Sequence, residues 1–183
     1  MKYFLDTEFN EDGRTIDLIS IALVCEDGRE FYAINRDAEL HRVNDWVRKN
    51  VLPHLPSYGS TLWKPRREIA HALTMFVNLG QGKPEFWGYY ADYDWVILCQ
   101  CFGTMMDLPE GWPKFCRDLK QLSVDLGSPK HPPDPEGEHD ALIDARWNRD
   151  LYNFLDNVRP IYQAEKGREM MAQLEKVEKK YAR

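Results

Sequence analysis

Apolar and polar positions alternate along three short segments near the start of the chain, at residues 2–6, 16–25 and 30–34. This two-residue period is typical of half-buried β-strands, because successive side chains of a strand point to opposite faces. Turn-forming residues occupy 10–13, and the Asp27-Gly28 pair favours a tight hairpin. The pattern therefore predicts an antiparallel meander of three strands.

After residue 40 the spacing of apolar residues changes to three and four, which is typical of helices with one buried face. We expect helices over residues 44–51, 65–79, 93–102, 120–126 and 139–157, with further strands at 85–89 and 115–119. Gly80 is the expected C-cap of the second helix. Residues 127–137 carry four prolines and should form an extended loop. This order predicts an α/β fold, with a mixed sheet between helices on both faces.

The segment that follows Pro160 differs from the rest of the chain. Met170, Leu174, Val177 and Tyr181 are spaced four, three and four residues apart on an otherwise charged helix. We therefore divide the chain into a main domain over 1–158 and a C-terminal helical extension over 159–183. The narrow apolar stripe fits two arrangements: the helix packs back on its own domain, or it forms a homodimer contact.

Composition limits the class of protein. A length of 183 residues with 43% hydrophobic content suits one globular domain, and no apolar run reaches the ~18 residues that a membrane helix needs. Asp6 and Glu8 interrupt the only N-terminal apolar run, so we expect no signal peptide. The four cysteines lack metal-site spacing, and we expect free thiols in a reducing cytoplasm.

Two carboxylates end the first predicted strand. Asp6 and Glu8 lie two residues apart, so their side chains should share one face of that strand. Neighbouring like charges disfavour joint ionisation unless a cation neutralises them. A divalent cation that prefers oxygen ligands is the simplest such partner.

Two later segments offer more groups of the same chemistry. Asp94 opens a predicted helix, and His139 and Asp144 begin the long helix near the C-terminus. Residues five apart on one helix lie roughly 140° apart around its axis. His139 and Asp144 can therefore reach one centre only if His139 lies in the loop before the helix.

These groups, taken in order, resemble the DEDD superfamily of 3′-to-5′ exonucleases in its histidine-bearing branch. Asp6-x-Glu8 matches the first motif of the family and His139-x-x-x-x-Asp144 the third. The second motif usually reads Asn-x-x-Phe-Asp, and here Tyr90 and Tyr93 replace the Asn and the Phe ahead of Asp94. The opening Asp-Thr-Glu-Phe and the segment 93–100 are similar to the mycobacterial-type exoribonuclease subfamily. The resemblance covers about residues 1–156.

The resemblance implies a ribonuclease-H-like fold and a two-metal mechanism with Mg²⁺ or Mn²⁺. Asp6 would bridge both ions, Glu8 would join it at the ion nearer the attacking water, and Asp94 and Asp144 would complete the ligand set. His139 would act as general base, which suits an imidazole that titrates near neutral pH. The expected reaction is hydrolysis from a 3′ end with release of nucleoside 5′-monophosphates, and the subfamily favours RNA.

Substrate contacts are expected from residues near the first two motifs. Bases of single strands stack on aromatic side chains. The candidates are Thr7, Phe9, Trp63, Tyr90 and Tyr93, with Phe9 foremost because it follows the two carboxylates. The net charge of −6 would fall to −2 with two divalent ions bound, which suits an enzyme that grips a few nucleotides at one 3′ end.

Two other functions remain open. A DNA exonuclease of the same fold would carry the same motifs, and no residue visibly reads a 2′-hydroxyl. A nucleic-acid-binding module with a relic site would be expected to have lost one of the five groups, yet all five are present.

Overall fold

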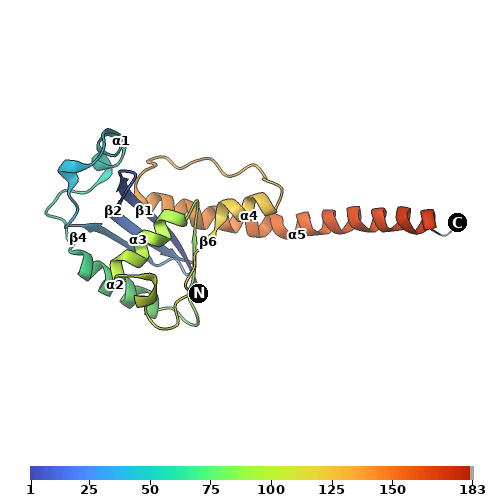
Figure 1. Cartoon of the computed structure of the whole chain (residues 1–183), viewed down its shortest axis with the longest axis horizontal. Helices are drawn as coiled ribbons and strands as arrows, with labels where there is room; N and C mark the ends of the chain where they lie inside the picture. The colour runs from blue at the N-terminus through green and yellow to red at the C-terminus, as the bar shows by residue number, and fades with distance from the viewer. Residues whose placement is uncertain (182–183) are drawn as a thin grey trace.

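The computed structural model describes the backbone of residues 1–181 and the side chains of residues 1–174. Its centre is a six-stranded mixed sheet with the order β4-β3-β2-β1-β5-β6 (Figure 1). The strands are β1 (Lys2–Glu11), β2 (Ile16–Cys25), β3 (Glu30–Asn35), β4 (Trp63–Lys64), β5 (Glu85–Gly88) and β6 (Arg117–Asp118). The first three form the expected antiparallel meander, and β4, β5 and β6 each pair in parallel with a neighbour. The predicted fold class is confirmed.

The predicted end of the first strand is wrong, and one short strand was not predicted. β1 does not end at Asp6 but continues to Glu11, so Asn10 and Glu11 are strand residues and not part of the turn. They are held by pairing with β2, which continues beyond an irregularity between Glu8 and Phe9. β4 was not predicted, because its two residues carry no period of their own.

Helices cover both faces of the sheet (Figure 1). Tyr3 and Leu5 belong to a core shared with α2 (Arg66–Asn78) and α3 (Asp92–Phe102). Phe4 points the other way, into a core shared with α4 (Leu119–Asp125) and α5 (Ala141–Tyr181). The alternation of β1 therefore assigns each of its side chains to one helical layer.

A short helical region lies between β3 and β4. It contains α1 (Asp45–Asn50), flanked by the 3-10 helices η1 (Leu40–Arg42) and η2 (Leu52–His54). Asn44 caps α1, because its side chain accepts a 2.9 Å hydrogen bond from the Val47 amide. A separate small core of Ile19, Val43, Val47 and Val51 attaches this region to β2. A third 3-10 helix, η3 (Met105–Asp107), follows α3.

Gly80 does not act as the expected C-cap. α2 ends at Asn78, and Gly80 is not among the glycines with a positive φ. Its small size has a different reason, because a Cβ at this position would lie 2.1 Å from the Tyr3 hydroxyl oxygen. That hydroxyl donates a 2.8 Å hydrogen bond to the Val77 carbonyl, so the glycine makes room for a contact between β1 and α2.

α5 is one continuous helix that crosses Pro160 without a break. Its first half packs on the sheet, and its second half projects away from the body (Figure 1). Met170 is 59% exposed and Leu174 is 48% exposed, so this half does not pack back on its own domain. Of the predicted stripe, the side chains of Val177 and Tyr181 lie outside the described residues.

Within residues 1–181, the structure contains no helix with the length and apolar character needed to cross a membrane.

Candidate active site

The two carboxylates of β1 lie on the face of the sheet that α5 covers. Asp6 and Glu8 share the parity of Phe4, which packs in the α5 layer, while Thr7 points to the opposite face. Glu8 is only 8% exposed, and Asp6 is partly buried. The period of β1 therefore places two acidic groups side by side in a poorly hydrated position.

Asp94 reaches the same place from α3. It lies in the first turn of that helix and is buried, whereas Asp92 is exposed. Its Oδ1 accepts hydrogen bonds from the Thr7 amide at 3.0 Å and from the Thr7 hydroxyl at 2.5 Å. Thr7 thus fixes Asp94 to β1, and because both bonds go to Oδ1, the second oxygen is free to face a cation.

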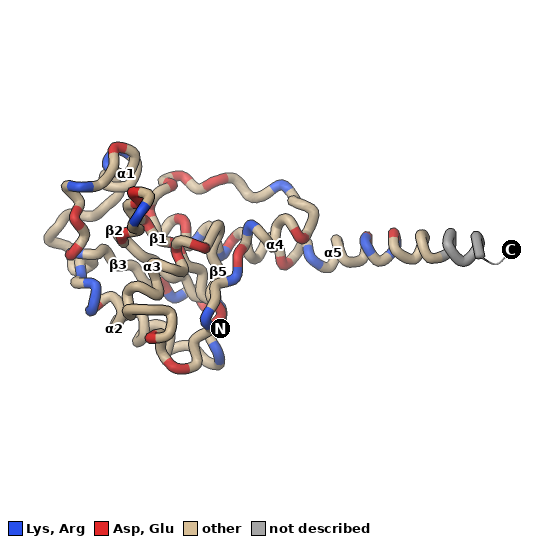
Figure 2. The backbone as a smooth tube through the Cα atoms, viewed as in Figure 1, with Lys and Arg blue, Asp and Glu red and all other residues tan. Residues whose placement is uncertain are grey.

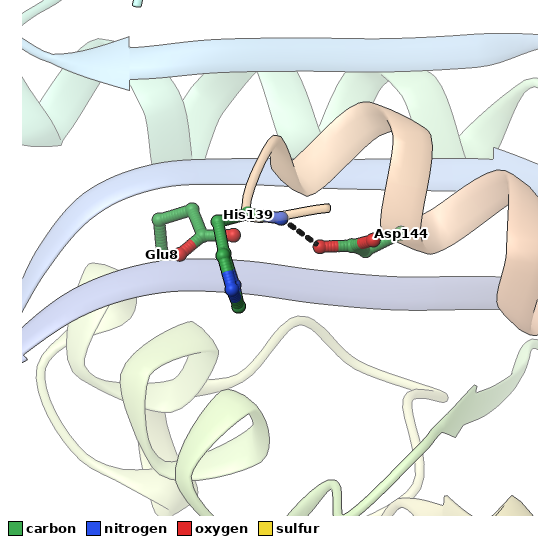
Figure 3. Close-up of side chains that lie close together, drawn as sticks. All are labelled: Glu8, His139 and Asp144. Atoms are coloured by element: carbon green, nitrogen blue, oxygen red, sulfur yellow. Dashed lines mark hydrogen bonds between the residues drawn. The ribbon is translucent and has the colours of Figure 1, made fainter. Parts of the chain in front are cut away.

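His139 and Asp144 come from the start of α5. As predicted, His139 lies outside the helix, which begins at Ala141. Its φ of 71° is in the left-handed region, and its amide donates a 2.9 Å hydrogen bond to Asp144 Oδ2 (Figure 3). Asp140 begins the helix by accepting a 2.9 Å bond from the Leu142 amide, so it acts as a cap. The turn of chain between His139 and Asp144 brings both side chains to Glu8.

A cavity of about 480 Å³ unites these groups. Its lining contains all five predicted catalytic residues: Asp6, Glu8, Asp94, His139 and Asp144. Potential ligand atoms of Glu8, His139 and Asp144 lie within 4.8 Å of one another (Figure 3). Segments separated by more than 80 residues in the sequence therefore meet at one site.

The carboxyl groups of the site have raised pKa values, which is the condition that a bound cation would relieve. Burial, with repulsion from Asp144 and Asp94, raises the pKa of Glu8 to about 8. Burial raises the pKa of Asp94 to about 7 even though its hydrogen bonds from Thr7 lower it, and burial raises the pKa of Asp144 to about 6. The pKa of Asp6 is also well above its usual value, because Asp6 is desolvated and close to Asp94 and Glu8.

Among the side chains of residues 1–174, no Lys or Arg neutralises this cluster. In the described part of the chain, none of the four carboxylates forms an ion pair. Four converging carboxylates without a basic partner fit hard divalent cations, which take oxygen ligands. The donor set is therefore compatible with the metal that the sequence predicted.

The family is decided by comparison with known proteins. The model of the Rv2179c-like 3′-5′ exoribonuclease domain matches residues 1–155. This chain belongs to the Rv2179c-like family.

Two relatives are the 3′-5′ exoribonucleases Rv2179c and MT2234.1 from two strains of Mycobacterium tuberculosis. Each is 49% identical over 147 residues, which cover 80% of this chain and 88% of the relative. The predicted resemblance to the mycobacterial-type exoribonuclease subfamily is confirmed.

Solved structures agree on the fold. Pop2p of S. pombe in a form with Mg²⁺ and Mn²⁺ bound has a TM-score of 0.54 at 12% identity, covering 82% of this chain and 81% of its own. The nuclease domain of 3′hExo, a DEDDh family member bound to rAMP, has a TM-score of 0.50 at 14% identity, covering 88% and 92%. At such low identity the likeness shows the shared ribonuclease-H-like fold.

The predicted substrate-binding residues divide into two groups in this Rv2179c-like chain. Thr7, Phe9, Tyr90 and Tyr93 line the cavity, and the rings of Phe9 and Tyr93 make an edge-to-face contact at 5.6 Å. Trp63 is not part of the lining. It lies in β4 at the far edge of the sheet, where its indole donates to the carbonyls of Pro56 and Ser57. The structure therefore places Trp63 apart from the other four candidates.

Sequence reasoning missed two residues that shape the site. Trp46 on α1 lines the cavity and meets His139 edge-to-face with ring centroids 4.8 Å apart. Asn148 is buried and donates a 2.9 Å hydrogen bond to the Leu5 carbonyl, which ties α5 to β1 beside the carboxylates. The signal for Asn148 was a polar residue on the apolar side of a helix, whereas α1 offers no local signal that Trp46 faces His139.

Proposed function

We propose that this chain is a metal-dependent 3′-to-5′ exoribonuclease that removes nucleotides from single-stranded RNA and releases nucleoside 5′-monophosphates. One observation carries the proposal: four carboxylates and a histidine from three segments converge on one cavity, in a chain of an exoribonuclease family. RNA rather than DNA rests on the family, whose mycobacterial relatives are named exoribonucleases.

The carboxylates would hold two divalent ions, Mg²⁺ or Mn²⁺. Asp6 would be shared by both ions, as the family resemblance implies, and it lines the cavity together with Glu8, Asp94 and Asp144. Glu8 and Asp144 would serve one side of it, and the free oxygen of Asp94 the other. When bound, such a pair of ions activates a water molecule and stabilises charge on the phosphate and the leaving oxygen.

His139 would accept the proton of the attacking water. Its position is set by two contacts: the hydrogen bond that its backbone amide donates to Asp144, and the edge-to-face contact of its ring with Trp46. His139 and Trp46 both line the cavity, and His139 precedes the start of α5. The imidazole therefore lies next to the carboxylates but outside the helix. A neutral imidazole at this point can take a proton and later release it to solvent.

Phe9 and Tyr93 would contact the 3′-terminal nucleotide. The two rings form one aromatic wall that adjoins both Thr7 and the metal-binding carboxylates. Stacking on such a wall tolerates any base, which suits an exonuclease that shortens a strand step by step.

The test is a cleavage assay with 5′-end-labelled single-stranded RNA and a DNA of the same sequence. We expect a ladder that shortens from the 3′ end, requires Mg²⁺ or Mn²⁺, stops with chelator and advances faster on RNA. Faster cleavage of DNA would favour the second candidate, a DNA exonuclease of the same fold. Binding without cleavage would favour a nucleic-acid-binding module.

The projecting half of α5 supports a proposal about assembly. It carries exposed apolar side chains, among them Ile161, Met170 and Leu174, on a helix that extends clear of the body (Figure 1). Two copies could pair through this stripe. Light scattering on the full chain and on a chain lacking residues 160–183 tests this, since an unchanged number of subunits would contradict pairing through the extension.

Two further proposals follow from the sequence. The chain would act in the reducing cytoplasm, which is supported by four cysteines that are all free thiols.

The main domain, residues 1–158, would fold without the extension, because the core of the α5 layer ends near Leu155, with Tyr162 packed at its margin. Circular dichroism of the shortened chain checks the second of these.

A further inference from the structure

Among the described residues, no Lys or Arg lines the candidate active site. The lining contains five acidic residues, Asp6, Glu8, Glu11, Asp94 and Asp144. Along the backbone drawn in Figure 2, the Lys and Arg positions are scattered among the described residues. A strand of nucleic acid that enters this cavity brings one negative charge per phosphate. Beyond the metal site, some cation at the rim has to receive the phosphates that precede the terminal nucleotide.

Lys120 is placed for that task. Its Nζ lies 5.8 Å from the centroid of the Tyr90 ring, and Tyr90 lines the cavity. Among the described side chains, Lys120 forms no ion pair, so its charge is available to a ligand. The Tyr90 ring is 63% exposed and adjoins Tyr89 edge-to-face at 4.7 Å. An open aromatic ring next to an ammonium group that no carboxylate neutralises is the combination that single-stranded nucleic acids bind.

The backbone beneath this pair is strained and firmly held. Tyr90 has a φ of 54°, which a bulky residue rarely adopts and which tends to occur at functional sites. Asp118 links the residues that follow the two partners: its Oδ2 accepts from the amide of Ala91 at 2.8 Å, and its Oδ1 accepts from the amide of Gln121 at 2.7 Å. One carboxylate therefore ties the backbone next to Tyr90 to the backbone next to Lys120.

We propose that Tyr90 and Lys120 form a platform for the nucleotide that precedes the 3′-terminal one. Its base stacks on the Tyr90 ring, and Lys120 contacts the phosphate on its 5′ side. The strand then leaves the cavity over the start of α4. This inference rests on the proposed function, and it gives a role to the aromatic residue that stands at this strained position.

The opposite rim of the cavity, lined by Asn44, Trp46 and Val47, is less suited to receive the strand. Of the basic residues near α1, Arg48 donates to the carbonyl of Val43 at 3.1 Å, and Arg42, which lines a second cavity, pairs with Glu39 at 2.7 Å. Glu11 adds negative charge to the lining. Lys49 on α1 is the basic residue to test for this alternative path.

The experiment compares two substrates of different length with the full chain. One is a single-stranded RNA of about ten nucleotides, and the other is the p-nitrophenyl ester of a nucleoside 5′-monophosphate, which fills only the terminal position. The variants are Lys120→Gln, which removes the charge, and Tyr90→Asn, which removes the ring but tolerates a positive φ. Lys120→Arg and Tyr90→Phe keep the charge and the ring. Lys83→Gln is the matched control, since Lys83 is exposed and precedes β5, at the end of that strand opposite to Tyr90.

We expect the ratio of kcat/KM for RNA to kcat/KM for the ester to fall about tenfold in Lys120→Gln and in Tyr90→Asn. Lys120→Arg and Tyr90→Phe should restore most of it. The slope of log kcat/KM for RNA against log salt concentration should lose about 0.7 in Lys120→Gln, the value for one phosphate contact on a single strand.

An unchanged ratio in Lys120→Gln, or the same change in Lys83→Gln, would overturn the platform. A fall in Lys49→Gln alone would move the strand to the opposite rim. These results differ from failure of the proposed function, because in that case the unmodified chain would cleave neither substrate.

Discussion

The two sides of the candidate active site are built differently. On the sheet side, Asp6, Glu8 and Asp94 belong to β1 and α3, and Thr7 links the strand to the helix through two hydrogen bonds to Asp94. On the loop side, His139 follows a long proline-rich segment and has a left-handed backbone. Its ring meets Trp46, whose own helix has only six residues.

This difference separates two tasks. Groups on regular elements keep their positions before any ligand arrives, which suits metal ligands that must converge within narrow limits. A group on a loop can move with the substrate, which suits a base that accepts a proton and then exchanges it with solvent. Variants of each side should therefore fail in different ways: loss of metal binding on the sheet side, and loss of turnover on the loop side.

Asp6→Asn tests the centre of the sheet side and should have the largest effect. We expect activity on single-stranded RNA to fall below detection and Mn²⁺ binding to weaken, because one of the converging charges is gone. Isothermal titration with Mn²⁺ and the RNA ladder assay measure the two results. The same substitution of the exposed Asp92, Asp92→Asn, is the control, and equal activity of both variants would contradict the assignment.

His139→Ala tests the loop side. The expected result is a decrease in kcat of roughly 10²–10⁴-fold, as for loss of a positioned base, with Mn²⁺ affinity retained. Single-turnover kinetics on RNA and metal titration check this pair of outcomes. If Mn²⁺ affinity fell as much as in Asp6→Asn, His139 would act as a ligand and the division between the two sides would be wrong.

Thr7→Val removes the side-chain hydroxyl that holds Asp94 while keeping a β-branched shape in the strand. Metal affinity should decrease by about 10- to 100-fold, the usual loss when a ligand loses its supporting hydrogen bond. Mn²⁺ titration gives the affinity, and thermal unfolding shows whether the fold is preserved. Unaltered affinity would mean that the Thr7 amide alone positions Asp94.

Trp46→Ala tests whether the loop side needs its aromatic wall. We expect kcat to fall about tenfold with little change in metal affinity, because a base that is displaced from its position transfers a proton less well. Trp46→Phe should recover much of the rate, since it keeps an aromatic edge against His139. If the two variants and the unmodified chain had equal rates, Trp46 would not position His139.

The pH dependence of stability should reveal the charges that both sides bring together. In the folded chain the pKa of Glu8 is raised to about 8 and that of Asp94 to about 7, whereas both are about 4 in an unfolded chain. The folded state therefore binds more protons between pH 4 and pH 8, and its stability falls as the pH rises through this window.

The melting temperature of the metal-free chain should decrease between pH 5 and pH 8, by about 5 °C or more. Mn²⁺ should oppose the decrease, and Asp6→Asn should make the metal-free chain less sensitive to pH. Differential scanning calorimetry with and without chelator measures all three effects. A metal-free chain that is more stable at pH 8 than at pH 5 would contradict the raised pKa values.

Much of this molecule follows from local patterns. The period of two in β1 was enough to predict that Asp6 and Glu8 share a face, and helical geometry was enough to place His139 before α5. The order of strands and helices was enough to predict a mixed sheet with helices on both faces. These features depend on spacing along a few residues, and backbone geometry sets that spacing wherever the segment lies in the fold.

Contacts between distant segments could only come from the tertiary structure. The Trp46 ring against His139, the amide of Asn148 on the Leu5 carbonyl and Lys120 beside Tyr90 each join elements that are far apart in the sequence. Trp63 shows the reverse case. It has the right chemistry for stacking, but the pairing of β4 with β3 places it at an edge of the sheet, away from the cavity. Periodicity tells which face of an element is buried, but the neighbour on that face depends on how strands pair and helices pack, and this is decided by the whole chain at once.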